Sequence, residues 1–184
     1  MKGVVFTEFL ELIENKFGYD MVDIVIESAK LPHNGIYTSG GTYPHAEMIS
    51  LVMALSQEAQ VAVPDLLVMY GEHLFARLIG MYPHLADGCN DPLDFMARVD
   101  NYIHVEVRKL YPDAELPKFM TVEKRPDLLV LDYVSSRGMQ DLGLGLMKGC
   151  ANFFKMPLNI YYQPMQDKGI EKFRFFISPA LEEN

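Results

Sequence analysis

The sequence predicts an α+β fold in a single domain of residues 1–184, with a helical N-terminal part followed by a C-terminal antiparallel sheet of about four strands and a packed helix. Three observations predict this fold. Apolar residues recur at helical spacing through the first two thirds of the chain, and short apolar runs replace them after Pro117. A chain of 184 residues, 49% of them hydrophobic, is also sufficient for one core and a lined cavity.

The helical part divides at Gly and Pro residues. The expected helices cover the opening segment up to Gly18, residues 21–29, about 45–59 with Pro44 at a first helical position, 64 to about 80, and 92 up to Pro112. The last of these has the most regular apolar ridge, formed by Met96, Val99, Ile103, Val107 and Leu110. We therefore expect one continuous helix between Pro92 and Pro112, with residues 30–43 as a connecting segment.

The C-terminal part changes period. Residues 119–122, 128–134, 158–162 and 173–177 are short apolar runs separated by turn-forming residues, which is typical of strands. Between the two pairs of runs, residues 139 to about 155 predict one more helix, which Pro157 ends. The sheet with its helix follows from this order.

Charge and composition exclude several classes of partner. The net charge of −9 disfavours a nucleic-acid surface, because Lys and Arg are needed to displace the counterions of phosphates. Glu8 and Glu11 interrupt the apolar stretch that a signal peptide requires, and no window approaches about 18 uncharged apolar residues. Two cysteines, Cys89 and Cys150, fit a reducing compartment. We expect a cytoplasmic protein without membrane insertion.

Common catalytic motifs are missing from the sequence. It has no His-x-x-x-His or Cys-x-x-Cys pair, no Gly-x-Ser-x-Gly elbow and no phosphate-binding Gly-x-x-x-x-Gly-Lys-Ser/Thr loop. Gly143, Gly145 and Gly149 are spaced somewhat like a dinucleotide-binding motif, but the third is one position late and the run lies inside an expected helix. Close packing of that helix on a neighbour is the simpler interpretation.

One histidine of five is a candidate metal ligand. His33, His45 and His84 each follow a proline in turn-like sequence, and His73 lies in an apolar helix. His104 follows the ridge residue Ile103, so its side chain lies at the edge of an apolar stripe. Placement alone favours a packed or hydrogen-bonded histidine, but a haem needs only one protein nitrogen because the porphyrin supplies four iron ligands.

A polar triplet adds donors of the kind that haem propionates need. Tyr133, Ser135 and Arg137, spaced Y-x-S-x-R at the end of an expected strand, place alternate side chains on one side of the backbone. All three donate hydrogen bonds, and Arg binds a carboxylate in bidentate fashion. On spacing alone, a polar ladder on an edge strand explains the triplet equally well.

Longer motifs give the sequence a specific resemblance. It begins Met1-Lys2-Gly3, has V-D-N-Y-I-H ending at His104, L-Y-P-D-A-E-L-P over 110–117 and Y-V-S-S-R over 133–137. In these motifs, their order and their distances, nearly the whole chain resembles the haem-nitric oxide/oxygen binding (H-NOX) family, which includes the haem domain of soluble guanylate cyclase. The stand-alone bacterial members are the most similar type.

The resemblance implies a haem b between the helical part and the sheet, with His104 as its axial iron ligand. It also implies that Tyr133, Ser135 and Arg137 bind the propionates and that Pro117 presses on the porphyrin. The implied remainder of the haem pocket is Val5, Phe9, Leu74, Leu78, Leu142 and Leu146. Leu142 stands where oxygen-binding members have a distal tyrosine, so we expect selectivity for NO, with CO as a further ligand, over dioxygen.

The resemblance also implies how a signal leaves the domain. NO would weaken or break the bond from iron to His104, and the N-terminal helices would then shift relative to the sheet. Because the sequence ends at Asn184 without an effector domain, we expect a separate partner, a histidine kinase or a cyclic-di-GMP enzyme. Some bacterial relatives carry a cysteine-rich zinc site, but this sequence has only Cys150 in its C-terminal part, so we expect no zinc.

Two alternatives compete with a sensor that is not an enzyme. A haem enzyme such as a peroxidase needs a distal acid or base, for which His73 is the only nearby candidate. A non-haem signalling module could carry a phosphoryl group on His104, but that chemistry needs an exposed histidine and not one beside an apolar ridge.

Overall fold

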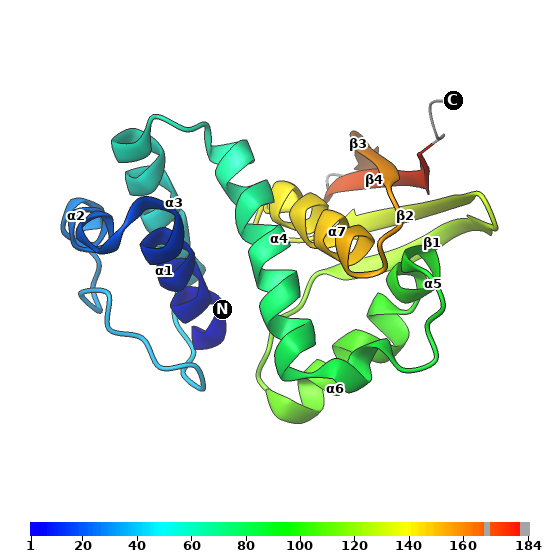
Figure 1. Cartoon of the computed structure of the whole chain (residues 1–184), viewed down its shortest axis with the longest axis horizontal. Coiled ribbons are helices and arrows are strands. Elements are labelled where there is room, and N and C mark those ends of the chain that lie inside the picture. The colour runs from blue at the N-terminus through cyan, green and yellow to red at the C-terminus, as the bar shows by residue number, and fades with distance from the viewer. Residues whose placement is uncertain (168–169, 181–184) are drawn as a thin grey trace.

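The computed structural model describes residues 1–167 and 170–180 (Figure 1). Its helices are α1 (Gly3–Phe17), α2 (Tyr19–Ala29), α3 (His45–Ala59), α4 (Val63–Met81), the 3-10 turn Pro83–Ala86, α5 (Pro92–Ala97), the π-helical segment Val99–Ile103, α6 (His104–Leu110) and α7 (Gln140–Phe153). Its strands are β1 (Lys118–Arg125), β2 (Leu128–Val134), β3 (Leu158–Asp167) and β4 (Ile170–Pro179). The mixed α+β fold predicted from the sequence is confirmed.

The four strands form one antiparallel sheet in the order β1-β2-β4-β3. Alternation along β2 directs Leu129, Leu131 and Tyr133 to the interior, where they are buried with Phe175 of β4. On the other face Asp132 is also buried, because Arg174 and Lys172 of β4 cover it with ion pairs of 2.7 and 2.9 Å. Those two cations hold the pKa of Asp132 below its usual value.

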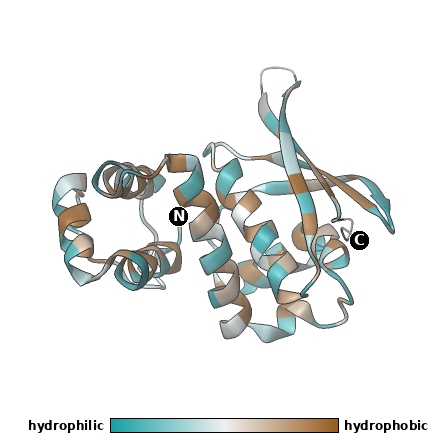
Figure 2. Ribbon diagram, turned by 45° about the horizontal axis from the view of Figure 1, so that its top comes forward, coloured by the Kyte–Doolittle hydropathy of each residue, from teal (hydrophilic) through white to brown (hydrophobic). Residues whose placement is uncertain are grey.

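The helices divide into two groups around α4. Figure 1 shows α1, α2 and α3 clustered on one side of α4, and α7 between α4 and the sheet. One buried apolar cluster lies among α1–α4 and includes Phe6, Leu55 and Tyr70, while a second lies among the C-terminal part of α4, α5, α7 and the sheet. The helices carry hydrophobic and hydrophilic residues on different sides (Figure 2), as the periodicity predicts.

Helix bounds follow the punctuation in the sequence closely. Gly18, with a φ of 92°, ends α1, and Pro64 lies in the first turn of α4. Pro44 precedes α3 and is not its first residue, a small correction to the expectation. β2 has the same seven residues as the predicted run, while β1, β3 and β4 extend their runs to 8, 10 and 10 residues.

The expected continuous helix between Pro92 and Pro112 is wrong. In the structure, a wide turn at 99–103 separates α5 from α6. In this turn the carbonyl of Arg98 accepts hydrogen bonds from the amide of Tyr102 at 2.8 Å and from the amide of Ile103 at 3.2 Å. A π turn contains one more residue than an α turn, so side chains beyond it rotate relative to the ridge. As a result His104 is buried while Leu110 is exposed.

Glycines let α7 approach α4 closely, as the sequence predicted for this run. A Cβ added at Gly145 would lie 2.2 Å from the carbonyl oxygen of Val68, and one at Gly149 would lie 2.7 Å from Cβ of Phe75. Gly143 differs, because it faces Phe175 and Tyr133, at 3.9 Å, and not α4. The interpretation of these glycines as packing residues is confirmed for Gly145 and Gly149.

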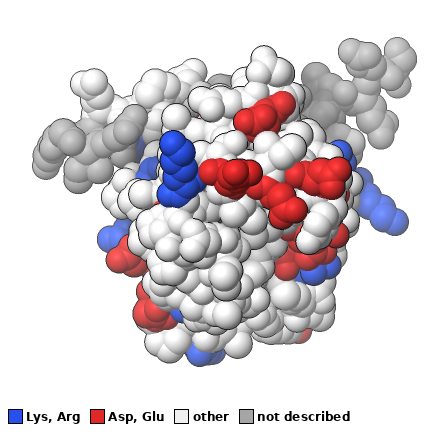
Figure 3. Space-filling view, turned by 90° about the vertical axis from the view of Figure 1, so that its left-hand side faces the viewer, with Lys and Arg blue, Asp and Glu red and all other residues white. Residues whose placement is uncertain are grey.

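Several acidic side chains lie on the face seen from the α1–α3 side (Figure 3), in keeping with the net charge of −9. Within residues 1–167 and 170–180, none of the helices taken singly has the length and apolar composition of a membrane span. α3 and α4 meet that test only as a pair bent by 113°.

Candidate functional site

A mostly apolar cavity of about 280 Å³ lies where the two helix groups and the sheet meet. Its wall is built from the start of α1, the second half of α4, the segment from α5 to α6, the loop 111–117, β1, β2 and α7. Sites for small molecules in proteins are typically cavities of this character, with a few polar groups among apolar walls. The polar groups here include His104, a pair of tyrosines and a small cluster around Arg137.

His104 begins α6 directly after the π-helical segment, and its imidazole is buried in the wall of this cavity. Its Nδ1 lies 3.4 Å from Oδ1 of Asp100. Burial lowers the pKa of His104, and the nearby Asp100 carboxylate opposes that shift. A lowered pKa keeps the ring neutral, and a proton on Nδ1 directed at Asp100 leaves the lone pair of Nε2 free to bind a metal.

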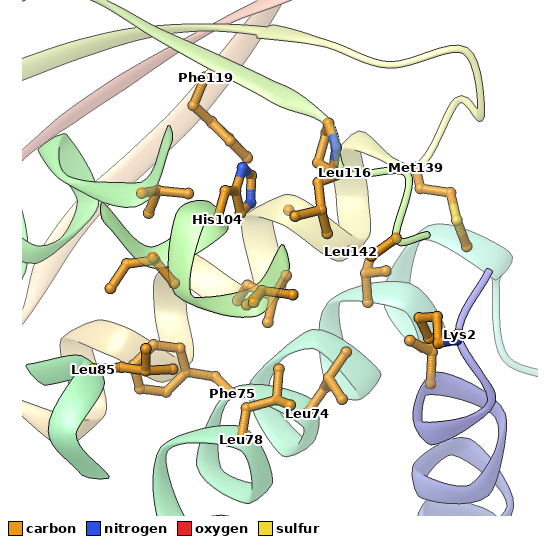
Figure 4. Close-up of a pocket in the computed structure, with 18 of the residues that line it drawn as sticks. Lys2, Leu74, Phe75, Leu78, Leu85, His104, Leu116, Phe119, Met139 and Leu142 are labelled. Atoms are coloured by element: carbon orange, nitrogen blue, oxygen red, sulfur yellow. The ribbon is translucent and has the colours of Figure 1, made fainter. Parts of the chain in front are cut away.

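The residues that surround His104 hold its ring in place. The ring of Phe119 on β1 is 6.0 Å from the imidazole, and the Phe119 amide donates to the same Asp100 oxygen at 3.4 Å. Figure 4 shows His104 beside Phe119, across the pocket from Leu74 and Leu78. One carboxylate thus links the histidine helix to the first strand.

The opposite wall is apolar. Leu74 and Leu78 come from α4, Leu142 and Leu146 from α7, and Val5 from α1, and all five line the cavity. Phe9, the sixth residue expected there, does not line it. It is fully buried one turn deeper along α1, with its ring 5.0 Å from that of Tyr70. Phe9 therefore supports the wall from behind.

Two tyrosine hydroxyls also belong to the cavity wall. Tyr82 follows α4 and Tyr111 follows α6, and their hydroxyl oxygens lie 3.3 Å apart. This contact and burial raise the pKa of Tyr111 to about 12. Tyr111 is therefore neutral at physiological pH, and its hydroxyl is bonded to that of Tyr82.

Tyr133, Ser135 and Arg137 come together at one end of the cavity, as predicted, but not for the predicted reason. Only Tyr133 lies on β2, which ends at Val134, so strand alternation does not align the three. Ser135 and Arg137 lie in the following turn, where the Arg137 amide donates to Oγ of Ser135 at 3.2 Å. Burial raises the pKa of Tyr133, while Ser135 and Arg137 oppose the shift.

The loop 111–117 closes the same end. Pro117 lines the cavity, and Arg137 donates to both the main-chain oxygen and the carboxylate of Glu115, at 2.9 and 2.7 Å. Lys2 donates to Asp113 at 3.0 Å, which ties the start of the chain to this loop. One charged rim of the cavity is therefore formed by four residues: Lys2, Asp113, Glu115 and Arg137.

The sequence reasoning missed several residues of this site, among them Asp100, Phe119 and Glu115. Asp100 could have been found, because it lies four residues before His104 within V-D-N-Y-I-H, and side chains at that spacing meet on a helix. Phe119 and Glu115 carry no such local signal. Their positions depend on how β1 and the loop before it pack against α6 and β2.

The donor set fits a haem better than a bare metal ion. Within the described residues, no three or more His, Cys, Asp or Glu side chains are grouped so that they could hold a metal. A haem needs one axial ligand, an apolar cavity and donors for two propionates. The axial ligand is supplied by His104, and the propionate donors are supplied by the cluster around Arg137. The apolar cavity is supplied by the leucine wall, which consists of Leu74, Leu78, Leu142, Leu146 and Val5.

Known proteins with a similar sequence and fold belong to a haem-binding family. The sequence model of the family described as Haem-NO-binding matches residues 2–162. The crystal structure of the Fe(II) unliganded H-NOX protein from K. algicida is 43% identical and has a TM-score of 0.91, over 99% of this chain and 98% of that one.

Two Shewanella structures also match. The solution structure of the IWP-051-bound H-NOX from Shewanella woodyi in the Fe(II)CO ligation state is 40% identical with a TM-score of 0.82, over 98% of this chain and 95% of that one. The H-NOX protein from S. oneidensis in the Fe(II)NO ligation state, 23% identical, shares the fold, with a TM-score of 0.89 over 98% of this chain and all of that one. No curated protein matches the chain. The chain belongs to the Haem-NO-binding, or H-NOX, family of haem-binding gas-sensor domains.

Proposed function

We propose that this protein is an NO sensor that binds haem b in the cavity, with His104 as the axial iron ligand. The observation that carries the proposal is the buried imidazole of His104, whose Nδ1 lies 3.4 Å from Asp100 and whose ring borders a mostly apolar cavity. Burial lowers the pKa of His104, which favours the neutral ring that binds a metal. Tyr133, Ser135 and Arg137 would hold the propionates, and Pro117 would press on the porphyrin from the loop 111–117.

Selectivity for NO over dioxygen rests on the leucine wall. Ferrous haem iron binds NO without help from the protein, whereas bound dioxygen is stabilised by a hydrogen-bond donor. Leu74, Leu78, Leu142, Leu146 and Val5 offer no donor from their side chains. Among the phenolic groups that line the cavity, those of Tyr82 and Tyr111 bond to each other. CO, which needs no donor either, is expected to bind as well.

Signalling would begin with the loss of the bond that His104 would make to the iron when NO binds. Release of His104 would free α6 and would act on β1 through Asp100, which contacts both His104 and the Phe119 amide. The wall residues Val5, Leu74 and Leu142 belong to three different helices, so a change at the haem reaches the α1–α3 group. We propose a separate histidine kinase or cyclic-di-GMP enzyme as the partner, in the cytoplasm.

Zinc is not part of the proposal. Cys150 is buried beneath α5, where burial raises the pKa of its thiol, and Cys89 shows a raised pKa for the same reason. Zinc is bound by thiolates, which form less readily when the pKa is raised. We expect metal analysis to find iron and no stoichiometric zinc.

The geometry disfavours both alternatives. A peroxidase would need an acid or base facing the leucine wall, but His73 is outside the cavity and its Nε2 lies 3.4 Å from Oε2 of Glu8. Phosphorylation of His104 would need an exposed ring, and this one is buried. A sensor that performs no catalysis is the function that both observations favour.

The test is an absorption spectrum of purified wild type, His104→Ala and His73→Ala, all expressed with adequate haem. Wild type and His73→Ala should show the same Soret band, because His73 does not reach the cavity. His104→Ala should lose the haem or retain it only with added imidazole. No Soret band in wild type would refute haem binding, and a normal five-coordinate ferrous spectrum in His104→Ala would place the ligand elsewhere.

The distal wall is tested with Leu142→Tyr. The ferrous wild type should not hold dioxygen stably in air, while Leu142→Tyr introduces a hydroxyl and should gain a measurable dioxygen complex. Leu142→Phe is the matched control, since it adds the ring without the hydroxyl. Stable dioxygen binding by wild type would show that a donor reaches the ligand.

A further inference from the structure

The rim of the cavity contains one arginine and a carboxylate from the chain itself. Arg137 is nearly buried, with 14% of its side chain exposed, whereas the Glu115 side chain is 85% exposed. Arg137 Nη2 donates to Oε2 of Glu115 at 2.7 Å, and Nη1 donates to the main-chain oxygen of the same residue at 2.9 Å. The carboxylate can swing into solvent, while the carbonyl is fixed by the loop.

The other cations of this rim are already engaged. The ammonium group of Lys2 donates to Asp113 and to Oγ1 of Thr42, at 3.0 and 2.8 Å. The N-terminal ammonium of Met1 donates to the Tyr43 carbonyl at 2.7 Å, and burial, followed by the charge of Arg137, lowers its pKa. Lys2 also lines the apolar cavity, and its partner Asp113 is 58% exposed, but the Lys2 ammonium group is held by Thr42 and the Gly40 carbonyl as well. Arg137 lines the same cavity and has the more exposed carboxylate partner, Glu115.

The same groups border a second, polar cavity of about 340 Å³ that adjoins the rim. Met1, Lys2 and Arg137 contribute three positive charges to it, against the two carboxylates of Asp113 and Glu115. Two haem propionates would bring two further negative charges to this rim. A propionate that binds Arg137 must then share the guanidinium with the Glu115 carboxylate, and the two like charges repel.

We propose that Glu115 competes with a haem propionate for Arg137 and thereby weakens haem retention by this domain. The inference rests on the proposed function, in which Arg137 holds a propionate. The competition is one that the propionate wins, because ion pairs with an exposed partner are weak and the haem also buries its apolar ring. Glu115 makes haem easier to lose, and its main-chain carbonyl keeps Arg137 oriented.

The test is the rate of haem transfer from the ferric protein to an excess of apomyoglobin, followed at the Soret band. Glu115→Gln removes the charge and keeps an amide oxygen of the same size, and the main-chain contact is unchanged. Exposed ion pairs contribute up to about 1 kcal/mol, so we expect haem loss about three- to fivefold slower than in wild type. A rate equal to or faster than that of wild type would overturn the proposal.

Two controls separate competition from a general effect of charge. Glu123→Gln is matched, since Glu123 is a half-exposed carboxylate that pairs with Arg125 at 3.1 Å but borders neither cavity. It should leave the rate within about 1.5-fold of wild type, because surface substitutions of this kind have small effects. An equal slowing by Glu123→Gln would assign the effect to net charge and overturn the proposal.

The second control changes the cofactor. Haem dimethyl ester carries no propionate charge, so the rates of wild type and Glu115→Gln loaded with it should coincide. If Glu115→Gln keeps its advantage with the ester, the carboxylates do not compete for Arg137. If the proposed function is wrong, the wild-type protein will have no Soret band. If only this inference is wrong, the Soret band will be present and Glu115→Gln will lose haem at the same rate as wild type.

Discussion

Helix α4 contacts α7 on one side and α1 on the other, and the two junctions differ in their chemistry. Against α7, backbone meets backbone: a Cβ on Gly145 would lie 2.2 Å from the Val68 carbonyl oxygen and 2.8 Å from Cα of Gly71. Against α1, long side chains make the contacts. Arg77 of α4 donates to Glu8 of α1 at 2.7 Å, and the Tyr70 hydroxyl donates to the Val5 carbonyl.

This difference indicates which of the two helix contacts can allow movement. A backbone contact that leaves no room for a methyl group has one geometry, and sliding would create overlap. Side-chain hydrogen bonds and ion pairs can form again after small shifts. We infer that α4, α7 and the sheet behave as one body, and that the α1–α3 group, whose Val5 reaches the cavity, is the part that shifts against it.

Gly145→Ala should have the largest effect, because it breaks the α4–α7 junction directly. The new methyl group has to displace the backbone of α4, and overpacking of this kind costs about 3 kcal/mol in the free energy of unfolding. Chemical denaturation measures this change in the free energy of unfolding. Gly143→Ala on the same helix is the control, since its Cβ would approach nothing closer than 3.9 Å. A Gly145→Ala protein as stable as Gly143→Ala would mean that the junction is looser than the structure indicates.

Glu8→Ala should have the next largest effect and should act on the α1–α4 junction. Glu8 is buried, and its carboxylate lies 2.7 Å from Nε of Arg77 and 3.4 Å from Nε2 of His73. Loss of charge-assisted hydrogen bonds to a buried carboxylate costs about 2 kcal/mol. Hydrogen exchange should speed up in α1 and stay unchanged in α7.

Glu11→Ala is the matched control for Glu8. Glu11 contacts the same arginine, at 3.1 Å, but both side chains are more than two-fifths exposed. Pairs of this kind contribute at most about 1 kcal/mol, so stability should change little. If Glu11→Ala destabilised the protein as much as Glu8→Ala, burial would not be what makes the Glu8 contacts important.

The sequence predicted the fold class and most helix bounds because local residues set them. Gly18 ends α1 with a positive φ, and Pro64 lies in the first turn of α4. The π-helical segment at 99–103 could not be predicted, because the ridge from Met96 to Leu110 fits an uninterrupted α-helix equally well. Asp100 in that turn accepts a hydrogen bond from the Phe119 amide, 19 residues further along the chain, and such a long-range contact is not visible in local periodicity.

The candidate site was predicted as a set of residues more reliably than as a geometry. Nine of the other ten predicted residues line one cavity with His104; Phe9 alone lies behind the wall. Helical spacing places Val5 and Phe9 on the same face of α1, but it does not tell how far along the helix the cavity extends. Similarly, strand alternation predicted that Ser135 and Arg137 would lie beside Tyr133. The three residues do line the same cavity, but a turn and not a strand positions Ser135 and Arg137.

Among the substitutions that remove a buried contact at the two junctions, Tyr70→Phe should have the smallest effect, and it is the finest test of the comparison between them. The substitution keeps the ring, whose centroid lies 5.0 Å from that of Phe9. It removes the buried hydroxyl, so the Val5 carbonyl loses the hydrogen bond that this hydroxyl donates. We expect a loss of about 1 kcal/mol in the free energy of unfolding, the usual contribution of one buried hydrogen bond. Because this bond crosses only the α1–α4 junction, amide exchange should rise around Val5 in α1 and not in α7. Equal acceleration in both helices would show that the two junctions open together, and the α1–α3 group would then not be the part that moves by itself.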